Sequence, residues 1–190
     1  MPATRHRPSA IVELRITVAE ITPPIWRQLL VPASFTLDTL HAVIMESFGW
    51  LDYHLYEFSS GGVRHASPHD EEPSGPLATK VTIAKLALQP GDRLEYTYDF
   101  GDDWKHEIEV LGFHHRAPDL PYPHCLDGAR ASPPEDCGGV PGYEELLRVL
   151  GDPEDEEHAS MREWVGAHYH PETFDIRAVN RILMLRFAAR

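Results

Sequence analysis

Two alternating segments joined by a short turn constrain the fold of this chain more than any other feature. Along residues 93–110, large side chains occupy every second position, and polar or charged side chains lie between them. A period of two is typical of a strand with one buried face, and Gly101-Asp102-Asp103 between the segments is typical of a tight turn. The pattern therefore predicts a β-hairpin. Its buried face is predicted to carry Leu94, Tyr96, Tyr98, Phe100, Trp104, His106, Ile108 and Val110.

Further segments predict the rest of a sheet and one helix. The sequence predicts strands over 11–19, 25–31 and 54–58. Between the second and third of these, Thr36 can cap a helix over 37–48 that Gly49 ends. The order strand, strand, helix, strand and late hairpin predicts an α+β fold, with a β-grasp-like mixed sheet and one helix crossing a face.

The second half of the chain is predicted to be a long loop followed by helices. Residues 114–142 contain several prolines and glycines, and they predict an irregular stretch. Helices are expected over 143–150, over 153–165 behind an Asp152 cap, and over 176–187 behind an Asp175 cap. The final helix is amphipathic, which favours docking onto the sheet over a free partner-binding face.

The length of the chain and its lack of long apolar runs bound the domain organisation. A chain of 190 residues suits one domain. We expect a flexible arm over 1–10 and a single domain over 11–190, with a sheet part over 11–113 and a loop and helical part over 114–190. No run of about 18 apolar residues and no secretory signal is visible, which predicts a cytoplasmic protein with no membrane association and with reduced cysteines.

The charge of the chain is acidic and unevenly placed. There are 30 Asp and Glu residues against 17 Lys and Arg, a formal net charge of −13, and the segment from Asp99 to Asp175 holds 19 of the acidic residues against 5 basic ones. Nucleic acids and anionic membranes bind basic surface, so this balance argues against direct nucleic-acid binding. It favours a cation or a basic partner instead.

Several short motifs occur in a characteristic order. They are Pro23-Pro24-Ile25-Trp26-Arg27, Phe48-Gly49-Trp50 with Asp52-Tyr53-His54-Leu55, Tyr98-Asp99-Phe100-Gly101-Asp102-Asp103-Trp104, the loop from Cys125 to Gly139, and Tyr143. Together they resemble the plasmid pRiA4b ORF-3-like family, from about residue 11 to the last helix. The resemblance implies an α+β fold with such a sheet and a passenger of plasmids and insertion elements, at times under a TnpR-type label. It implies no settled activity.

The turn of the predicted hairpin carries three carboxylates, those of Asp99, Asp102 and Asp103. Such an oxygen-rich corner can bind Mg²⁺ or Mn²⁺, or supply a general acid and base. The alternative is ordinary turn chemistry, because Asp side chains accept hydrogen bonds from nearby backbone N–H groups. Both interpretations remain open at this point.

Two histidines are candidate ligands. His54 follows Asp52 and lies on the same strand face as Tyr56, and His106 shares its face with Trp104. One interpretation is a pair of packed histidines, with one ring nitrogen satisfied inside the protein. The other is a shared His54/His106 site that binds a metal ion or carries a proton.

The loop between Cys125 and Cys137 is the most unusual segment, because two thiols lie 12 positions apart among prolines, glycines and carboxylates. Zinc accepts thiolates together with imidazoles, so Cys125, Cys137, His54 and His106 form a candidate metal set. The loop also fits a structural role with free thiols, held by Arg130 pairing with a carboxylate. Redox use and a disulfide are the remaining alternatives.

Two functional hypotheses follow. The first is a non-catalytic module that binds a protein or small ligand through an acidic and aromatic face, because no phosphate loop, nucleophile elbow or dinucleotide fingerprint occurs. The second is a metal-assisted hydrolase or nuclease-like enzyme that uses the His, Asp and Cys cluster with zinc, magnesium or manganese. The predicted binding residues are Trp50, Asp52, Tyr53, His54, Tyr98, Asp99, Asp102, Asp103, Trp104, His106 and Arg130.

Overall fold

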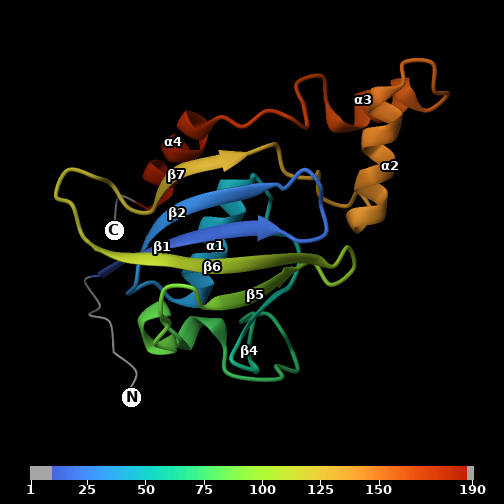
Figure 1. Ribbon diagram of the computed structural model, residues 1–190. Helices are drawn as coiled ribbons and strands as arrows, with labels where there is room; N and C mark the ends of the chain where they lie inside the picture. Colours follow the sequence, from blue (N-terminus) through green and yellow to red (C-terminus); the bar gives the residue numbers. More distant parts are fainter. Residues whose placement is uncertain (1–9, 188–190) are drawn as a thin grey trace.

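Seven strands form one sheet in residues 10–187, the part of the chain that this computed structural model describes (Figure 1). Across the sheet they run in the order β4-β3-β5-β6-β1-β2-β7. Every pair of neighbouring strands in this order is antiparallel. The bounds are β1 Ala10–Val18, β2 Trp26–Pro32, β3 Tyr56–Ser60, β4 Val63–Ala66, β5 Arg93–Tyr98, β6 Trp104–His115 and β7 His124–Ala129.

The fold class is α+β, as predicted, but the sheet is antiparallel where a mixed sheet was expected. Hairpin connections make antiparallel neighbours, and β6 also runs antiparallel to β1, where a mixed sheet needs a parallel pair. This order does not confirm the β-grasp-like topology. The predicted arm over 1–10 lies outside the described residues, except for Ala10, which begins β1.

The predicted hairpin is confirmed as β5 and β6, with Tyr96 opposite His106. The side chains of its predicted inner face are buried along both strands. Phe100 is the exception, because the chain turns after β5 and leaves this ring exposed. A period-two pattern therefore located the strands correctly, and it failed only where the turn begins.

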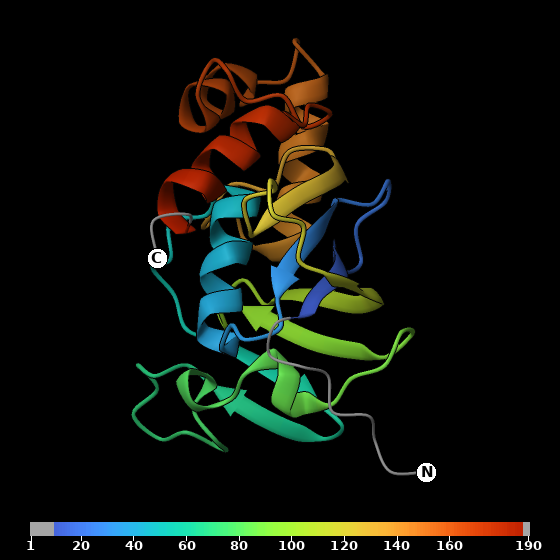
Figure 2. The same cartoon turned by 90° about the vertical axis from the view of Figure 1, so that its left-hand side faces the viewer.

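One helix, α1 (Leu37–Phe48), covers the buried face of the sheet (Figure 2). Thr36 Oγ1 accepts a hydrogen bond from the N–H of Thr39 at 3.1 Å, and Gly49 ends the helix in the left-handed conformation at φ 78°. Both signals are those that the sequence predicts. Apolar side chains of α1 and of the central strands form one continuous core.

Three helices follow the sheet, and two 3₁₀ turns precede β5: α2 (Gly139–Gly151), α3 (His158–Val165), α4 (Ile176–Phe187), η1 (Ala78–Lys80) and η2 (Ile83–Leu86). Helix α4 packs against α1 and β7, as the docking prediction requires, and α2 packs against α3 (Figure 1). Asp175 caps α4 as predicted, because its Oδ1 accepts hydrogen bonds from the N–H groups of Arg177 and Ala178. Within residues 10–187, every helix is too short or too polar to cross a membrane.

Two predictions for the second half were wrong in part. The stretch over 114–142 is not irregular throughout, because it contains β7 and the start of α2. Strand β7 has no alternating pattern, and it forms because its backbone pairs with β2. Helix α3 begins at His158, later than predicted. The carboxylates of Asp152 and Asp155 each accept a hydrogen bond from a backbone N–H two residues on, which holds that segment in turns.

Two glycines of α2 provide a matched test of how tightly its first turn packs. A Cβ added at Gly142 would lie 1.9 Å from the backbone oxygen of Cys137, whereas one added at Gly151 would meet nothing within 4 Å. We expect Gly142→Ala to lower the free energy of unfolding by about 2 kcal/mol or more. Gly151→Ala should raise it by about 0.5 kcal/mol, because alanine loses less conformational freedom in a helix. Urea unfolding measures both, and equal stabilities would contradict the prediction.

Candidate functional site

A stack of aromatic rings joins the end of α1 to the β5–β6 hairpin. The centroid of the Trp50 indole lies 5.3 Å from that of the Tyr98 ring and 6.1 Å from that of the Trp104 indole. All three side chains are buried. These three predicted binding residues therefore lie in the core. Of the four predicted aromatic binding residues, only Tyr53 is exposed.

Polar atoms of this stack hold the loop that precedes α2. The Nε1 of Trp50 donates a hydrogen bond to the carbonyl of Pro133 at 2.9 Å, and the hydroxyl of Tyr98 donates to Oε1 of Glu135 at 2.5 Å. The Oε2 of Glu135 accepts a hydrogen bond from the N–H of Leu51 at 2.9 Å. Burial and the hydrogen bond to Glu135 raise the pKa of Tyr98, which therefore stays a neutral donor.

These contacts bring together three ligand-type side chains from distant segments. His54 follows α1, Asp99 follows β5, and Asp136 lies in the loop before α2. The Nε2 of His54 is 3.6 Å from Oδ2 of Asp99 and 3.2 Å from Oδ1 of Asp136. Imidazole nitrogen and carboxylate oxygen are donors that bind divalent metals. Asp136 is not among the predicted binding residues, since nothing in its sequence context shows that this loop folds back over the hairpin.

The other carboxylates of the hairpin turn contact different partners. Asp102 Oδ2 accepts a hydrogen bond from a backbone N–H at the start of α2 at 3.1 Å, and Asp103 pairs with Lys105 at 2.5 Å. Asp99 accepts a hydrogen bond from the N–H of Gly101 at 2.9 Å through Oδ1. The turn-chemistry interpretation therefore describes Asp99, whereas Asp102 and Asp103 bind a distant backbone N–H and a lysine. Of the three, Asp99 is also the one that belongs to the metal-ligand group of the described residues.

Asp52 belongs to a separate network around a histidine of α1. The Nε2 of His41 donates to Oδ1 of Asp52 at 2.7 Å, and its Nδ1 lies 2.8 Å from the hydroxyl of Tyr96. The hydrogen bond from His41 lowers the pKa of Asp52, and burial raises that of Tyr96. His41 was not predicted as a polar site residue, because its position on the buried face of a helix gives no such signal. The network ties α1 to the sheet.

His106 lies outside the metal-ligand group of the described residues. Its buried ring lies edge-on to Phe48 and Trp50, with centroids 5.4 and 5.3 Å apart. Its Nδ1 donates to the carbonyl of Trp104 at 3.0 Å. Burial lowers the pKa of His106 to about 4. The packed-histidine interpretation therefore describes this residue.

The two cysteines are free thiols. The buried Cys125 donates a hydrogen bond to the carbonyl of Asp127 at 3.3 Å, and Cys137 is half-buried before α2. Burial raises the pKa of Cys125 to about 11 and that of Cys137 to about 12, so both stay protonated near neutral pH. Arg130 pairs with Glu172 at 2.8 Å, as predicted for a loop that an arginine holds. The geometry favours the structural-loop interpretation, and neither thiol joins the metal-ligand group of the described residues.

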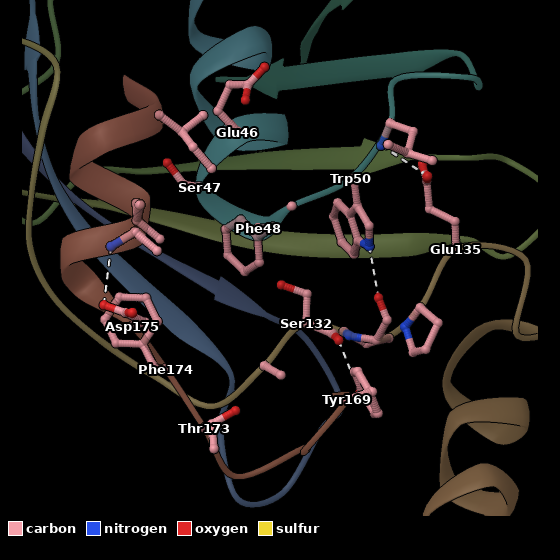
Figure 3. Close-up of a pocket in the computed structure, with 18 of the residues that line it drawn as sticks. Glu46, Ser47, Phe48, Trp50, Ser132, Glu135, Tyr169, Thr173, Phe174 and Asp175 are labelled. Carbon is pink, nitrogen blue, oxygen red and sulfur yellow. Dashed lines mark hydrogen bonds between the residues drawn. The ribbon is translucent and has the colours of Figure 1, made fainter. Parts of the chain in front are cut away.

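A pocket of about 650 Å³ lies between the end of α1, the loop before α2 and helix α4 (Figure 3). We refer to it as the α1–α4 pocket. Phe48 and Trp50 form one wall, and Ser132 and Tyr169 lie across from them, joined by a hydrogen bond of 3.1 Å from the Tyr169 hydroxyl to the Ser132 carbonyl. Sequence patterns do not reveal this pocket, because its walls come from segments far apart in the chain.

Arg27 is a buried cation in the lining of the α1–α4 pocket. Its guanidinium donates to the carbonyls of Ser47 and Ala129 and lies 4.7 Å from the centroid of the Phe48 ring and 4.3 Å from that of Phe174. Burial lowers the pKa of Arg27 to about 10, which leaves it charged at neutral pH. Because carbonyls and ring faces surround it, Arg27 positions the pocket wall.

The chain matches the family model described as plasmid pRiA4b ORF-3-like protein over residues 10–178. It belongs to the plasmid pRiA4b ORF-3-like family. The uncharacterised protein y4hQ of Sinorhizobium fredii is 35% identical over 161 residues, which cover 84% of this chain and 82% of that relative. A crystal structure of a protein of unknown function, MM3350 from Methanosarcina mazei Go1, has a TM-score of 0.79 at 35% identity, over 88% of this chain and 96% of that one.

Membership of the pRiA4b ORF-3-like family confirms the predicted resemblance without naming an activity, because both relatives are described as uncharacterised or of unknown function. The matched region spans the sheet, α2, α3 and the start of α4. It therefore includes the His54 group and most of the α1–α4 pocket. The TnpR-type label and the mobile-element context stay predictions.

The buried imidazole of His106 predicts a pH dependence of stability. Its pKa falls from an ordinary 6.5 to about 4 in the folded protein. As the pH falls, His106 therefore takes up a proton in the unfolded chain at a higher pH than in the folded protein. The contribution of neutral His106 to the free energy of unfolding is fully present above the ordinary histidine pKa of 6.5. It is lost as the pH falls toward about 4, the pKa of His106 in the folded protein. At about pH 5 the loss is roughly 2 kcal/mol.

Urea unfolding at about pH 7.5 and about pH 5 measures this effect. His106→Leu should remove the roughly 2 kcal/mol of the acid-induced loss that this residue causes. The matched control His115→Leu changes an exposed histidine at the end of β6 and should keep the wild-type pH dependence. An unchanged pH dependence in His106→Leu would contradict the assignment.

Proposed function

We propose that this protein is a non-catalytic binding module, whose α1–α4 pocket takes a protein segment with an apolar side chain next to a basic one. The observation that carries the proposal is the presence, in one pocket, of an aromatic wall, an exposed apolar rim and an excess of carboxylates. A cytoplasmic location is part of the same proposal, supported by the two free thiols.

Apolar side chains are exposed around the mouth of the pocket. Leu51 is 63% exposed, Tyr53 is 73% exposed and Trp164 is 50% exposed, and all three line the pocket. Ile182 of α4 adds a further exposed apolar side chain to the lining. Exposed apolar patches beside a pocket mark interaction sites in soluble proteins. An apolar side chain of a partner would be removed from water there, which favours binding by about 25 cal/mol per Å² buried.

Carboxylates outnumber basic groups in the lining. The carboxylates are those of Glu46, Glu135, Asp136 and Asp175. Among the described lining residues, Arg27 is the one lysine or arginine, so four negative charges and one positive charge give a formal net charge of −3. Arg186 pairs with Glu46 from outside the lining. The field of the pocket favours a basic partner, whose cation can also contact the exposed ring of Trp164.

The metal-assisted hydrolase hypothesis is less well supported by this geometry. Of its predicted ligands, His54 and Asp99 lie together. In contrast, Asp102 binds a backbone N–H, Asp103 pairs with a lysine, and His106 is packed among aromatic rings. The predicted ligands therefore lie in several different environments, whereas the residues of the α1–α4 pocket line one cavity.

Two short fluorescein-labelled peptides test the proposal by fluorescence anisotropy at about 0.15 M salt. One peptide alternates leucine with lysine, and the other alternates leucine with glutamate. A chelator is present throughout. The lysine peptide should bind at least about tenfold more tightly than the glutamate peptide, because the lining is acidic.

Matched variants then show whether the pocket is the binding site. Leu51→Ala and Trp164→Ala should each weaken binding of the lysine peptide about fivefold, because each removes apolar surface from the rim. Leu126→Ala is the control, since this exposed leucine of β7 lies outside the pocket lining. It should leave the affinity within about twofold. Wild-type affinity in both rim variants, or equal binding of the two peptides, would refute the proposal.

A further inference from the structure

His54, Asp99 and Asp136 have the spacing of ligands to a single metal ion. The Nε2 of His54 lies 3.6 Å from a carboxylate oxygen of Asp99 and 3.2 Å from one of Asp136, and all three ligand atoms lie within 4.8 Å of one another. Ligand atoms about 2.1 Å from a tetrahedral ion are about 3.4 Å apart. We propose that these three residues bind one divalent transition-metal ion.

The charges of the group favour a cation. The side chain of Asp99 is only 9% exposed, and a buried carboxylate is costly unless a positive charge or several hydrogen bonds balance it. Its Oδ1 accepts a hydrogen bond from Gly101, and the nearby Lys105 pairs with Asp103. The group contains two carboxylates, and one divalent ion matches their combined charge.

The orientation of His54 provides a second, independent observation. Its Nε2 atom is shielded from solvent and has no hydrogen-bond partner within residues 10–187, although it faces two carboxylates. Buried polar atoms are rarely left without a partner. A metal ion between the three side chains satisfies the nitrogen and both oxygens together.

The group stands on well-held elements. Asp99 donates its N–H to the carbonyl of the residue after His54 at 2.9 Å. The imidazole of His54 lies edge-on to the ring of Tyr98, with centroids 5.8 Å apart. The hydroxyl of the same Tyr98 binds Glu135, the neighbour of Asp136. One tyrosine therefore positions two of the three ligands, and a prearranged set loses little conformational freedom when the ion binds.

The donor set selects the kind of ion. One imidazole nitrogen and two carboxylate oxygens suit zinc, manganese or a similar transition ion, whereas magnesium and calcium prefer oxygen ligands throughout. The side chain of Asp136 is 68% exposed, so an ion can enter from solvent and keep water in its remaining coordination positions. The site shares only Asp136 with the lining of the α1–α4 pocket, and the inference does not depend on the proposed function.

Isothermal titration calorimetry of chelator-stripped protein with ZnCl₂ tests the site. The wild-type protein should bind one equivalent of zinc. His54→Ala and Asp136→Asn should each weaken binding by about tenfold or more, because each removes one of three ligands. Asp136→Asn changes an exposed side chain, so it keeps the test valid if His54→Ala disturbs folding. The Co²⁺ complex should show visible d–d absorption without the charge-transfer band of a thiolate ligand.

Two control variants separate this site from the other candidate ligands. Asp103→Asn and Cys137→Ser should bind zinc within about twofold of wild type. Absence of stoichiometric binding to the wild type, or unchanged affinity in both ligand variants, would overturn the proposal. Loss of binding in Cys137→Ser alone would place the ion in the cysteine loop and overturn it as well. Peptide binding to the α1–α4 pocket is measured with chelator present. A failure of the metal-site proposal therefore leaves the peptide-binding result unchanged, and the reverse also holds.

Discussion

The stacked pair of Trp50 and Tyr98 is the interaction on which the arrangement of the site depends. The rings lie 5.3 Å apart in the core, and their polar atoms bind Pro133 and Glu135 in the loop before α2. Displacing the loop would leave two buried donors unsatisfied, at about 1–3 kcal/mol each. The loop is therefore held over the hairpin, which places Asp136 beside the turn and gives the α1–α4 pocket one of its walls.

Two further buried polar side chains hold the surrounding framework. Arg27 lies between the rings of Phe48 and Phe174 and so joins β2 to α1 and to the segment before α4. His41 joins α1 to the sheet through Tyr96. In both cases the cost of burial is offset by ring faces and hydrogen bonds inside the protein. The groups available to a ligand are those at the exposed rim, and the buried network keeps them in position.

Local patterns were informative where local contacts decide the structure. The alternation in β5 and β6 follows from the pleat of a strand, and the signals at Thr36 and Gly49 follow from backbone groups one helical turn away. The same rules failed where distant contacts decide. Strand β7 lacks alternation and forms because β2 offers an unpaired edge, and the carboxylate of Asp152 satisfies a backbone N–H in a turn instead of starting a helix.

The sequence alone predicted the α+β class, the hairpin, the family resemblance and the candidate ligands His54, Asp99 and His106. The packing of distant segments decided which of them meet. His106 points into the core because strand alternation places it there, whereas Asp136 reaches Asp99 because the loop before α2 crosses the hairpin. Residue types and short hydrophobic periods report on contacts between neighbours along the chain. Which side chains from separate elements meet depends on how the core packs and which partners its buried polar groups find. Only the folded chain determines this.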